Sequence, residues 1–164
     1  MAETGGADAD VVAVAAVQEE VGFAGSRTTA YALRPTCAVV VDVTHATDTP
    51  GAEIKASGAH PFGSGAVIAR GTILHPKISD MLVEAAEEEE IPFTLEASGR
   101  NTGTDADAVH LSRAGVPTGL VSIPLRYMHS PVEMVCLDDV DAAARLIAAF
   151  ARRLTADVSF ERSG

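Results

Sequence analysis

Three runs of apolar residues constrain the fold of this chain more than any other feature of its sequence. They occupy residues 11–17, 37–41 and 120–125, the last interrupted by Ser122 and Pro124. Apolar and polar positions do not alternate strictly in them, which is typical of strands that are covered on both faces. With 164 residues, 47% of them apolar, the chain is long enough to bury a core of its own. We therefore expect a globular domain built on a buried, largely parallel sheet.

Helical patterns and shorter strands lie between these runs. Apolar residues recur at helical spacing at Ile78, Met81, Leu82, Ala85 and Ala86. A last helix is predicted after Asp138, with its apolar face at Val140, Ala144, Ile147, Ala151 and Leu154. Shorter elements are expected at 27–33 (a helix capped by Ser26), at 66–70 and 92–97 (strands) and at 104–113 (a helix), whereas 43–65 looks irregular. This alternation predicts a three-layer α/β sandwich, with a domain at 11–155 and polar tails at 1–10 and 156–164.

The excess of acidic residues argues against some classes of binding partner. The chain carries 12 Lys and Arg against 23 Asp and Glu, a formal net charge of −11, which disfavours nucleic acid and anionic membranes as partners. No apolar run is long enough to cross a bilayer, and no secretory signal is recognisable. The two cysteines, Cys37 and Cys136, lie among apolar residues and form no C-x-x-C pair. We expect a cytoplasmic protein.

Each apolar run is followed by side chains that bind metal ions. Glu19 and Glu20 follow the first run, Asp42 the second and His129 the third. Two adjacent carboxylates after a buried strand are costly unless something uses them. Because ligands of open α/β sheets bind beyond the C-terminal ends of the strands, parallel neighbours would bring these residues to one edge. Carboxylates and imidazole suit Zn²⁺ or Co²⁺, and the remaining carboxylate could act as a general base.

Other interpretations of these polar residues stay open. A single Asp or His after a strand is also typical of a turn or a helix cap. His45 either supports the metal ligands or belongs only to its loop. Asp48 either joins the site or serves the turn at Pro50 and Gly51. Arg126 either pairs with an acidic group of the site or the substrate, or forms a structural ion pair.

Five short motifs occur in order along the chain. They are V-Q-E-E-V-G at 17–22, V-D-V-T-H-A-T-D-T-P-G at 41–51, G-T-D-A at 103–106, G-V-P-T at 115–118 and R-Y-M-H-S-P-V-E at 126–133. Together they resemble family forty-two of the metallopeptidases, which contains glutamyl, deblocking and tetrahedral aminopeptidases and some members labelled endoglucanase. The resemblance covers about residues 11–155. It implies part of a zinc-peptidase-like catalytic domain, without the β-rich domain that is inserted in the family.

The resemblance implies a role for each matching residue. Glu19 corresponds to the general base that takes a proton from metal-activated water. Glu20 and His129 correspond to ligands of one metal ion, and Asp42 to a ligand of the other. Thr104 and Asp105 correspond to a wall of the site that faces the substrate. The implied protein is a homo-oligomeric aminopeptidase that acts on peptides with two divalent ions, Zn or Co.

Two parts of the complete family site have no match in this sequence. Similar enzymes supply a further His ligand and a bridging Asp from upstream, so we expect upstream sequence in the complete protein and an incomplete di-metal site here. Activity of this chain alone is therefore an open question. The competing hypothesis is a non-catalytic α/β domain or subunit of the same fold with a structural or assembly role. An endoglucanase is disfavoured because no carboxylate pair has an aromatic sugar platform beside it, and the chain has no Trp.

Overall fold

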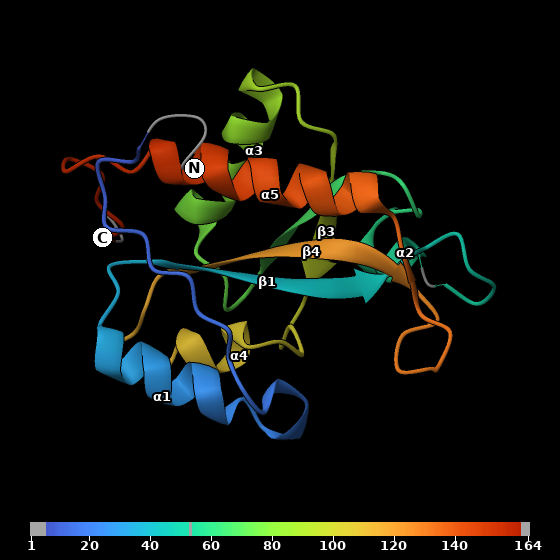
Figure 1. Ribbon diagram of the computed structural model, residues 1–164, viewed down its shortest axis with the longest axis horizontal. Coiled ribbons are helices and arrows are strands. Elements are labelled where there is room, and N and C mark those ends of the chain that lie inside the picture. Colours follow the sequence, from blue (N-terminus) through green and yellow to red (C-terminus); the bar gives the residue numbers. More distant parts are fainter. Residues whose placement is uncertain (1–5, 53, 162–164) are drawn as a thin grey trace.

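A central sheet with helices on both faces forms the body of the molecule (Figure 1). The computed structural model describes residues 6–52 and 54–161, so the outermost parts of both predicted tails lie outside the described residues. The strands are β1 (Ala38–His45), β2 (Ala66–Gly71), β3 (Phe93–Ser98), β4 (Thr118–Arg126) and β5 (Met134–Val135). The α-helices are α1 (Ala24–Leu33), α2 (Ile54–Ser57), α3 (Pro76–Glu88), α4 (Ala106–Val109) and α5 (Leu137–Arg152), and Glu19–Val21 forms a 3₁₀ turn, η1. The three-layer α/β prediction is confirmed.

The strands lie in the order β1-β4-β2-β3, and the short β5 pairs with β4. β1 and β4 are parallel, as are β2 and β3, whereas β2 and β4 are antiparallel and pair only at Val67–Ser122 and Ile68–Val121. The prediction of a largely parallel sheet is thus confirmed, although β4 pairs in the antiparallel sense with both β2 and the short β5. As a result, the C-terminal ends of β1 and β4 point to one edge of the sheet, and those of β2 and β3 to the other.

The larger core lies between the sheet and helices α3 and α5, and α1 and α4 cover part of the opposite face (Figure 1). The predicted stripe of α3 is confirmed, since Ile78, Leu82, Ala85 and Ala86 are all buried. The stripe predicted for α5 was wrong at Val140 and Ala144, which are exposed, whereas Ala151 is buried and Leu154 packs against the core. The buried face runs instead through Ala142, Ala143, Leu146, Ala149, Phe150 and Ala151. An alanine-rich helix offers apolar residues on nearly every side, so spacing alone does not select the buried one.

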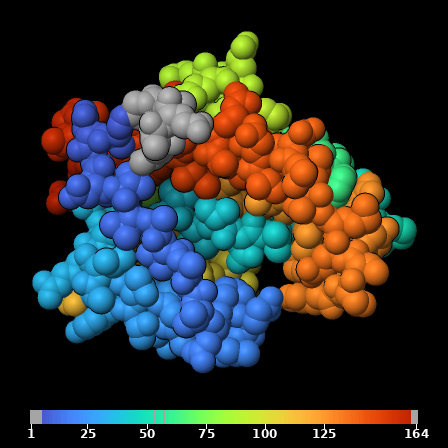
Figure 2. Space-filling view, in the orientation of Figure 1, coloured from blue at the N-terminus to red at the C-terminus, as the bar shows by residue number. Residues whose placement is uncertain are grey.

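The apolar segment 11–17 is not the buried strand that was predicted. It runs along the outside of the molecule across β1 (Figure 2), with Val12 62% and Val17 65% exposed. Within the described chain it joins no strand ladder, and β1 keeps a free edge on which Val41 is 48% exposed. An apolar run is buried as a strand only where neighbouring elements supply backbone partners and cover. No described element does so here.

Several boundaries also differ from the prediction. Helix α1 begins after Phe23 without a side-chain cap, and the Ser26 hydroxyl instead donates to the Phe23 carbonyl. Helix α4 is a single short turn, and the segment 43–65, which was predicted to be irregular, contains the end of β1 and helix α2.

Beyond α5 the chain packs back against the body of the molecule and buries Phe160 in the larger core. Among the described helices, none combines the length and hydropathy needed to cross a membrane.

Candidate metal and catalytic site

A sharp turn before α1 presents Glu19 and Glu20. Gln18 has a left-handed backbone (φ 61°, ψ 31°), which costs a residue with a Cβ roughly 1–2 kcal/mol. Backbone hydrogen bonds close the turn, among them those from Phe23 N to Gln18 O (3.0 Å) and from Gly25 N to Val17 O (3.0 Å). Both carboxylates therefore leave the chain within one 3₁₀ turn, Glu19 partly buried and Glu20 exposed.

His129 meets Glu20 from the loop after β4. Its Nε2 lies 3.3 Å from Glu20 Oε1, and both side chains are largely exposed, at 67% and 73%. The backbone of His129 is also left-handed (φ 60°), and its N–H donates to Glu133 Oε1 at 2.5 Å. The predicted pairing of Glu20 with His129 is thus visible as a direct contact.

Asp42 does not follow a strand, as was expected, but lies within β1. The strand continues to His45 because its last residues still pair with β4, so Asp42 stands opposite Ser122. Val40, two residues earlier on the same face, packs against the α4 side of the sheet. Asp42 lies farther along this face and is only partly buried, and its Oδ1 accepts the Val43 N–H at 2.7 Å.

The loop before α4 brings a further carboxylate to the site. Asp107 holds this loop by accepting hydrogen bonds from the N–H groups of Thr102 (2.8 Å) and Gly103 (3.1 Å). The buried Thr104 accepts the Ala106 N–H at 3.2 Å. Between them, Asp105 has a buried Oδ1 that finds no hydrogen-bond partner among the described residues. A buried carboxylate oxygen without a partner is costly, so this atom indicates a missing cation or donor.

The electrostatics connect these side chains into one cluster. Burial raises the pKa of Glu19, the negative charges of Asp42, Glu20 and Asp105 raise it further, and His129 lowers it. Burial also raises the pKa of Asp42; the Val43 N–H opposes this shift, and Asp105 and Glu20 add to it. Like charges gathered in this way disfavour the ionised state unless a cation joins them.

The donor types fit a divalent cation, although the described residues do not complete its ligand set. In the ranges 6–52 and 54–161, no three His, Cys, Asp or Glu side chains are arranged to hold a metal ion. Glu20 and His129 make a direct contact, and Asp42 and Asp105 contribute through charge at longer range. Carboxylates, one imidazole and the orphaned Asp105 oxygen are nevertheless the donors that Zn²⁺ or Co²⁺ accepts.

The open question about Arg126 and Asp48 is resolved as a structural ion pair. The Arg126 guanidinium contacts both carboxylate oxygens of Asp48, with Nε 3.4 Å from Oδ1, and lies 4.5 Å from the centre of the Phe62 ring. The hydrogen bond from Arg126 lowers the pKa of Asp48. Neither residue is joined to the carboxylate cluster by a hydrogen bond or ion pair in the described chain.

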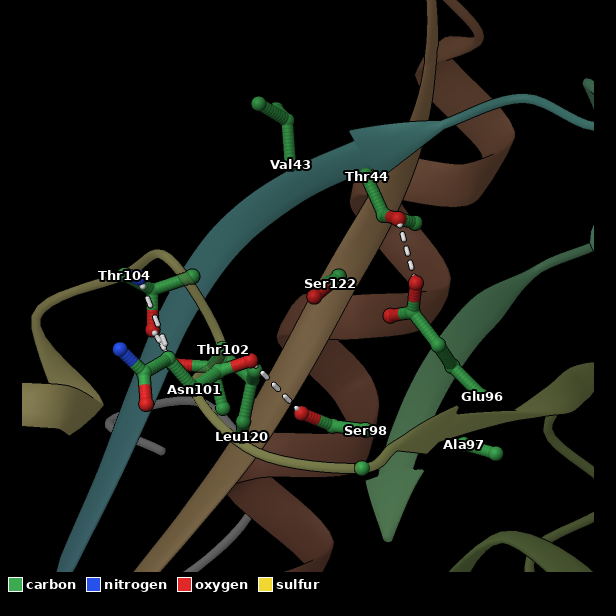
Figure 3. A pocket seen from close by; sticks show the side chains of 11 residues that line it. Val43, Thr44, Glu96, Ala97, Ser98, Asn101, Thr102, Thr104, Leu120 and Ser122 are labelled. Carbon is green, nitrogen blue, oxygen red and sulfur yellow. Dashed lines mark hydrogen bonds between the residues drawn. The ribbon is translucent and has the colours of Figure 1, made fainter. Parts of the chain in front are cut away.

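A recess beside Asp42 was not foreseen from the sequence. Its volume is about 230 Å³, and residues of β1, β3, β4 and the loop after β3 line it (Figure 3). Glu96 on β3 reaches Thr44 on β1, whose Oγ1 donates to Glu96 Oε1 at 2.8 Å. The available signal was an ionisable residue inside the predicted strand 92–97, but its partner lies 52 residues away in sequence and could not be identified.

Comparisons with known proteins find relatives of this chain among aminopeptidases. The lysyl aminopeptidase of Pyrococcus furiosus is 39% identical over 147 residues, which cover 90% of this chain and 42% of the relative. A solved TET aminopeptidase from the marine sediment archaeon Thaumarchaeota archaeon SCGC AB-539-E09 superposes with a TM-score of 0.80 at 33% identity, covering 87% of this chain and 40% of that chain. The TET1 peptidase of Pyrococcus horikoshii, described as assembling into a tetrahedron or a large octahedral shell, gives 0.66 at 28% identity, with 85% and 40% covered.

The chain thus spans about two fifths of the length of the relatives that it matches. The family model for the M42 glutamyl aminopeptidases matches residues 2–146, which is most of the sequence. On this match and these identities, the chain belongs to the M42 glutamyl aminopeptidase family.

Proposed function

We propose that this chain is part of the catalytic domain of a metal-dependent aminopeptidase, which removes N-terminal residues from peptides. The observation that carries the proposal is the carboxylate and imidazole cluster of Glu19, Glu20, Asp42, Asp105 and His129 in an M42 family chain. These residues come from four separate segments, and a purely structural role would not require their charges to be gathered at one place.

Each residue of the cluster has a proposed task. Glu20 and His129 would hold one divalent ion and Asp42 a second, and when bound these ions would polarise the scissile carbonyl and lower the pKa of water. Glu19 is the proposed general base, because it lies beside the proposed ligand Glu20 and its pKa is raised, the direction that favours uptake of a proton. It would take a proton from the attacking water and return it to the departing amine.

Thr104 and Asp105 are proposed to form the wall of the site that faces the peptide. The buried oxygen of Asp105 without a partner supports this role, since an N–H group of a substrate could satisfy it. Thr104 holds the loop in place through its hydrogen bonds to Thr102 and Ala106. We infer that residues 11–155 form the partial catalytic domain and that residues 1–10 and 156–164 are tails.

The proposed enzyme needs more than these residues provide. No three-ligand group is present in the described part of the chain, so we propose that the complete site takes ligands from elsewhere and that this chain alone is inactive or weakly active. A homo-oligomer is proposed because the similar TET1 peptidase assembles into closed shells. A cytoplasmic location is supported by the two free thiols, Cys37 and Cys136.

The direct test is hydrolysis of aminoacyl p-nitroanilides by the purified chain with Co²⁺ or Zn²⁺, beside the variants Glu19→Gln and Glu84→Gln. Glu84 is an exposed carboxylate on α3. The variant Glu84→Gln therefore removes the same charge as Glu19→Gln, but away from the cluster. Turnover that requires metal, is lost in Glu19→Gln and is kept in Glu84→Gln would support the proposal. Absence of turnover by this chain, beside activity of a longer version that supplies further ligands, would show only that the site here is incomplete. Absence of turnover in both would favour the second candidate, a non-catalytic subunit, for which the incomplete ligand set of the described residues is the specific observation.

A further inference from the structure

We propose that Glu133 is a positioning residue, which holds the backbone of His129 in its left-handed conformation and so directs the imidazole towards Glu20. In this role Glu133 acts through His129 and is not itself a ligand. The inference rests on the proposed function for one point only, that His129 binds a divalent ion.

The loop after β4 contains two residues whose backbone conformation is unfavourable for a residue with a Cβ. Tyr127 and His129 are both left-handed, with φ angles of 61° and 60°. The Ser130 N–H closes this turn by donating to the Tyr127 carbonyl at 3.1 Å. The result is an imidazole whose Nε2 lies 3.3 Å from the Glu20 carboxylate. Conformations of this kind persist only where the surrounding structure imposes them, so the loop needs a restraint.

Side-chain packing does not supply this restraint. Tyr127 is 51% exposed and Val132 is 63% exposed, and the side chain of His129 is 67% exposed. Within the described chain, none of these residues belongs to a hydrophobic core cluster. The restraint therefore has to come from hydrogen bonds.

The hydrogen bond of the His129 N–H differs from that of a left-handed residue at a helix end. Arg34 ends helix α1, and its N–H donates to the main-chain carbonyl of Ala30 at 3.1 Å, which is a usual way to end a helix. His129 instead follows a strand, and its N–H donates to the side-chain carboxylate of Glu133 at 2.5 Å. A charged acceptor makes a stronger hydrogen bond than a carbonyl does, so Glu133 can hold a conformation that no helix supports.

The orientation of the imidazole depends on this backbone contact. Residues behind a metal-binding histidine usually fix its ring through the second ring nitrogen. Within the described part of the chain, Glu20 is the only hydrogen-bond partner of the His129 ring, so no such group orients it from behind. The direction of the ring is therefore set by the main chain of His129, and Glu133 is the side chain that holds this main chain.

The local turn explains how Glu133 reaches its partner. The Ser130 hydroxyl oxygen accepts the Val132 N–H at 3.3 Å, which turns the chain back towards His129. The apparent affinity for a ligand falls with the fraction of protein that is in the binding-competent conformation. Loss of the Glu133 acceptor should therefore weaken cation binding although no ligand is removed.

The test compares Glu133→Ala and Glu133→Gln with the parent by NMR of the isotopically labelled chain. Without added metal, the one-bond Cα–Hα coupling of His129 reports whether φ is positive. We expect the left-handed value in the parent and in Glu133→Gln, because glutamine keeps the acceptor oxygen and loses only the charge. Glu133→Ala should lose it. Since Glu133 is exposed, all variants should keep the urea midpoint of the parent, which a merely structural role would lower.

A Zn²⁺ titration then measures the consequence for the cation. Zn²⁺ should shift the imidazole signals of His129, and Glu133→Ala should bind it about tenfold more weakly than the parent. Glu133→Gln should remain within about threefold of the parent. Glu84 is an exposed carboxylate on α3, so Glu84→Ala is the matched control and should bind as the parent does.

An unchanged coupling or an unchanged Zn²⁺ affinity in Glu133→Ala would overturn the inference. An equal loss in both Glu133 variants would overturn it too, because the effect would then belong to the charge and not to the hydrogen bond. A parent chain in which His129 does not respond to Zn²⁺ would count against the proposed function, and the coupling of His129 would then decide this inference by itself.

Discussion

The imidazole Nε2 of His129 lies 3.3 Å from the Glu20 carboxylate, although 109 positions separate the two residues in the sequence. Each is reached through a left-handed backbone, at Gln18 on one side and at His129 itself on the other. Strained conformations of this kind persist only where the surrounding structure imposes them. The contact is exposed and adds little to stability, which agrees with the proposal that both side chains bind one cation.

Replacing either partner should therefore weaken the binding of divalent ions. We expect Glu20→Gln and His129→Ala each to reduce Zn²⁺ affinity by at least about tenfold, a loss that even residues behind metal ligands can cause. Isothermal titration calorimetry of the metal-free protein measures this directly. Glu87 is an exposed carboxylate on α3, so Glu87→Gln is the matched control. Equal affinity in all variants would exclude Glu20 and His129 as ligands.

The buried Asp139 at the start of α5 should be important for stability. Its carboxylate accepts the N–H groups of Gly63 (2.9 Å) and Gly65 (2.7 Å), which joins the loop before β2 to the helix. Asp139→Ala leaves both buried donors without a partner, and we expect the free energy of unfolding to fall by about 3 kcal/mol. The neighbouring Asp138 is exposed, so Asp138→Ala should cost at most about 1 kcal/mol. Urea unfolding of both variants decides the comparison, and similar losses would contradict it.

Glu89 should make stability depend on acid. Hydrogen bonds from Arg152 lower the pKa of Glu89, so the folded state binds its proton more weakly than the unfolded state does. The stabilisation is fully present above the unfolded pKa near 4.5 and is lost as the pH falls through the lowered folded value. Because the pair is partly exposed, we expect Glu89→Gln to cost about 0.5–1 kcal/mol at pH 7.

The pH profile provides the check. Thermal melts of the parent and Glu89→Gln should differ at pH 7, approach each other as the pH falls below 4.5, and converge in about 1 M salt, where charge pairs are screened. A difference that persists in acid would mean that Glu89 acts through packing and not through its charge.

Gly119 should not tolerate a larger residue. A Cβ at this position of β4 would lie 2.4 Å from Cγ2 of Ile78, a fully buried side chain of α3. Since this atom belongs to a fully buried side chain and would have to shift, we expect Gly119→Ala to lower the free energy of unfolding by about 1–3 kcal/mol. Gly99→Ala is the control, because no atom lies within 4 Å of its added Cβ. Guanidinium unfolding at equilibrium measures both, and an unchanged midpoint in Gly119→Ala would show that α3 can shift.

The elements predicted correctly from the sequence are those in which the apolar residues lie on the face that neighbouring elements bury. Helix α3 and strands β2, β3 and β4 were recognisable because their apolar residues face neighbours within the chain. Residues 11–17 were wrongly predicted to form a buried strand. Their apolar composition shows that the segment could be buried, but not whether a neighbouring element covers it. The antiparallel junction of β2 with β4 could not be predicted either, since strand order depends on contacts that are distant in sequence.

The candidate site was predicted through residues that stand near turns. Glu20 and His129 meet as expected, whereas the residues that surround the recess come from strand interiors and a loop. Asp139 left a usable signal, because it lies on the same helical face as Ala142, Ala143 and Leu146. A charged residue in phase with an apolar stripe indicates a buried carboxylate with backbone partners.

The exposed course of residues 11–17 has a consequence for the proposed binding of a cation. The segment that carries Glu19 and Glu20 is held by a few turn hydrogen bonds and by no sheet ladder in the described chain. If a cation binds here, it would have to fix this segment in addition to neutralising the carboxylates. The conformational entropy lost by the segment would then reduce the observed binding free energy of the cation. Any element that pairs with the free edge of β1 and fixes residues 11–17 would thereby raise the apparent metal affinity without contributing a ligand.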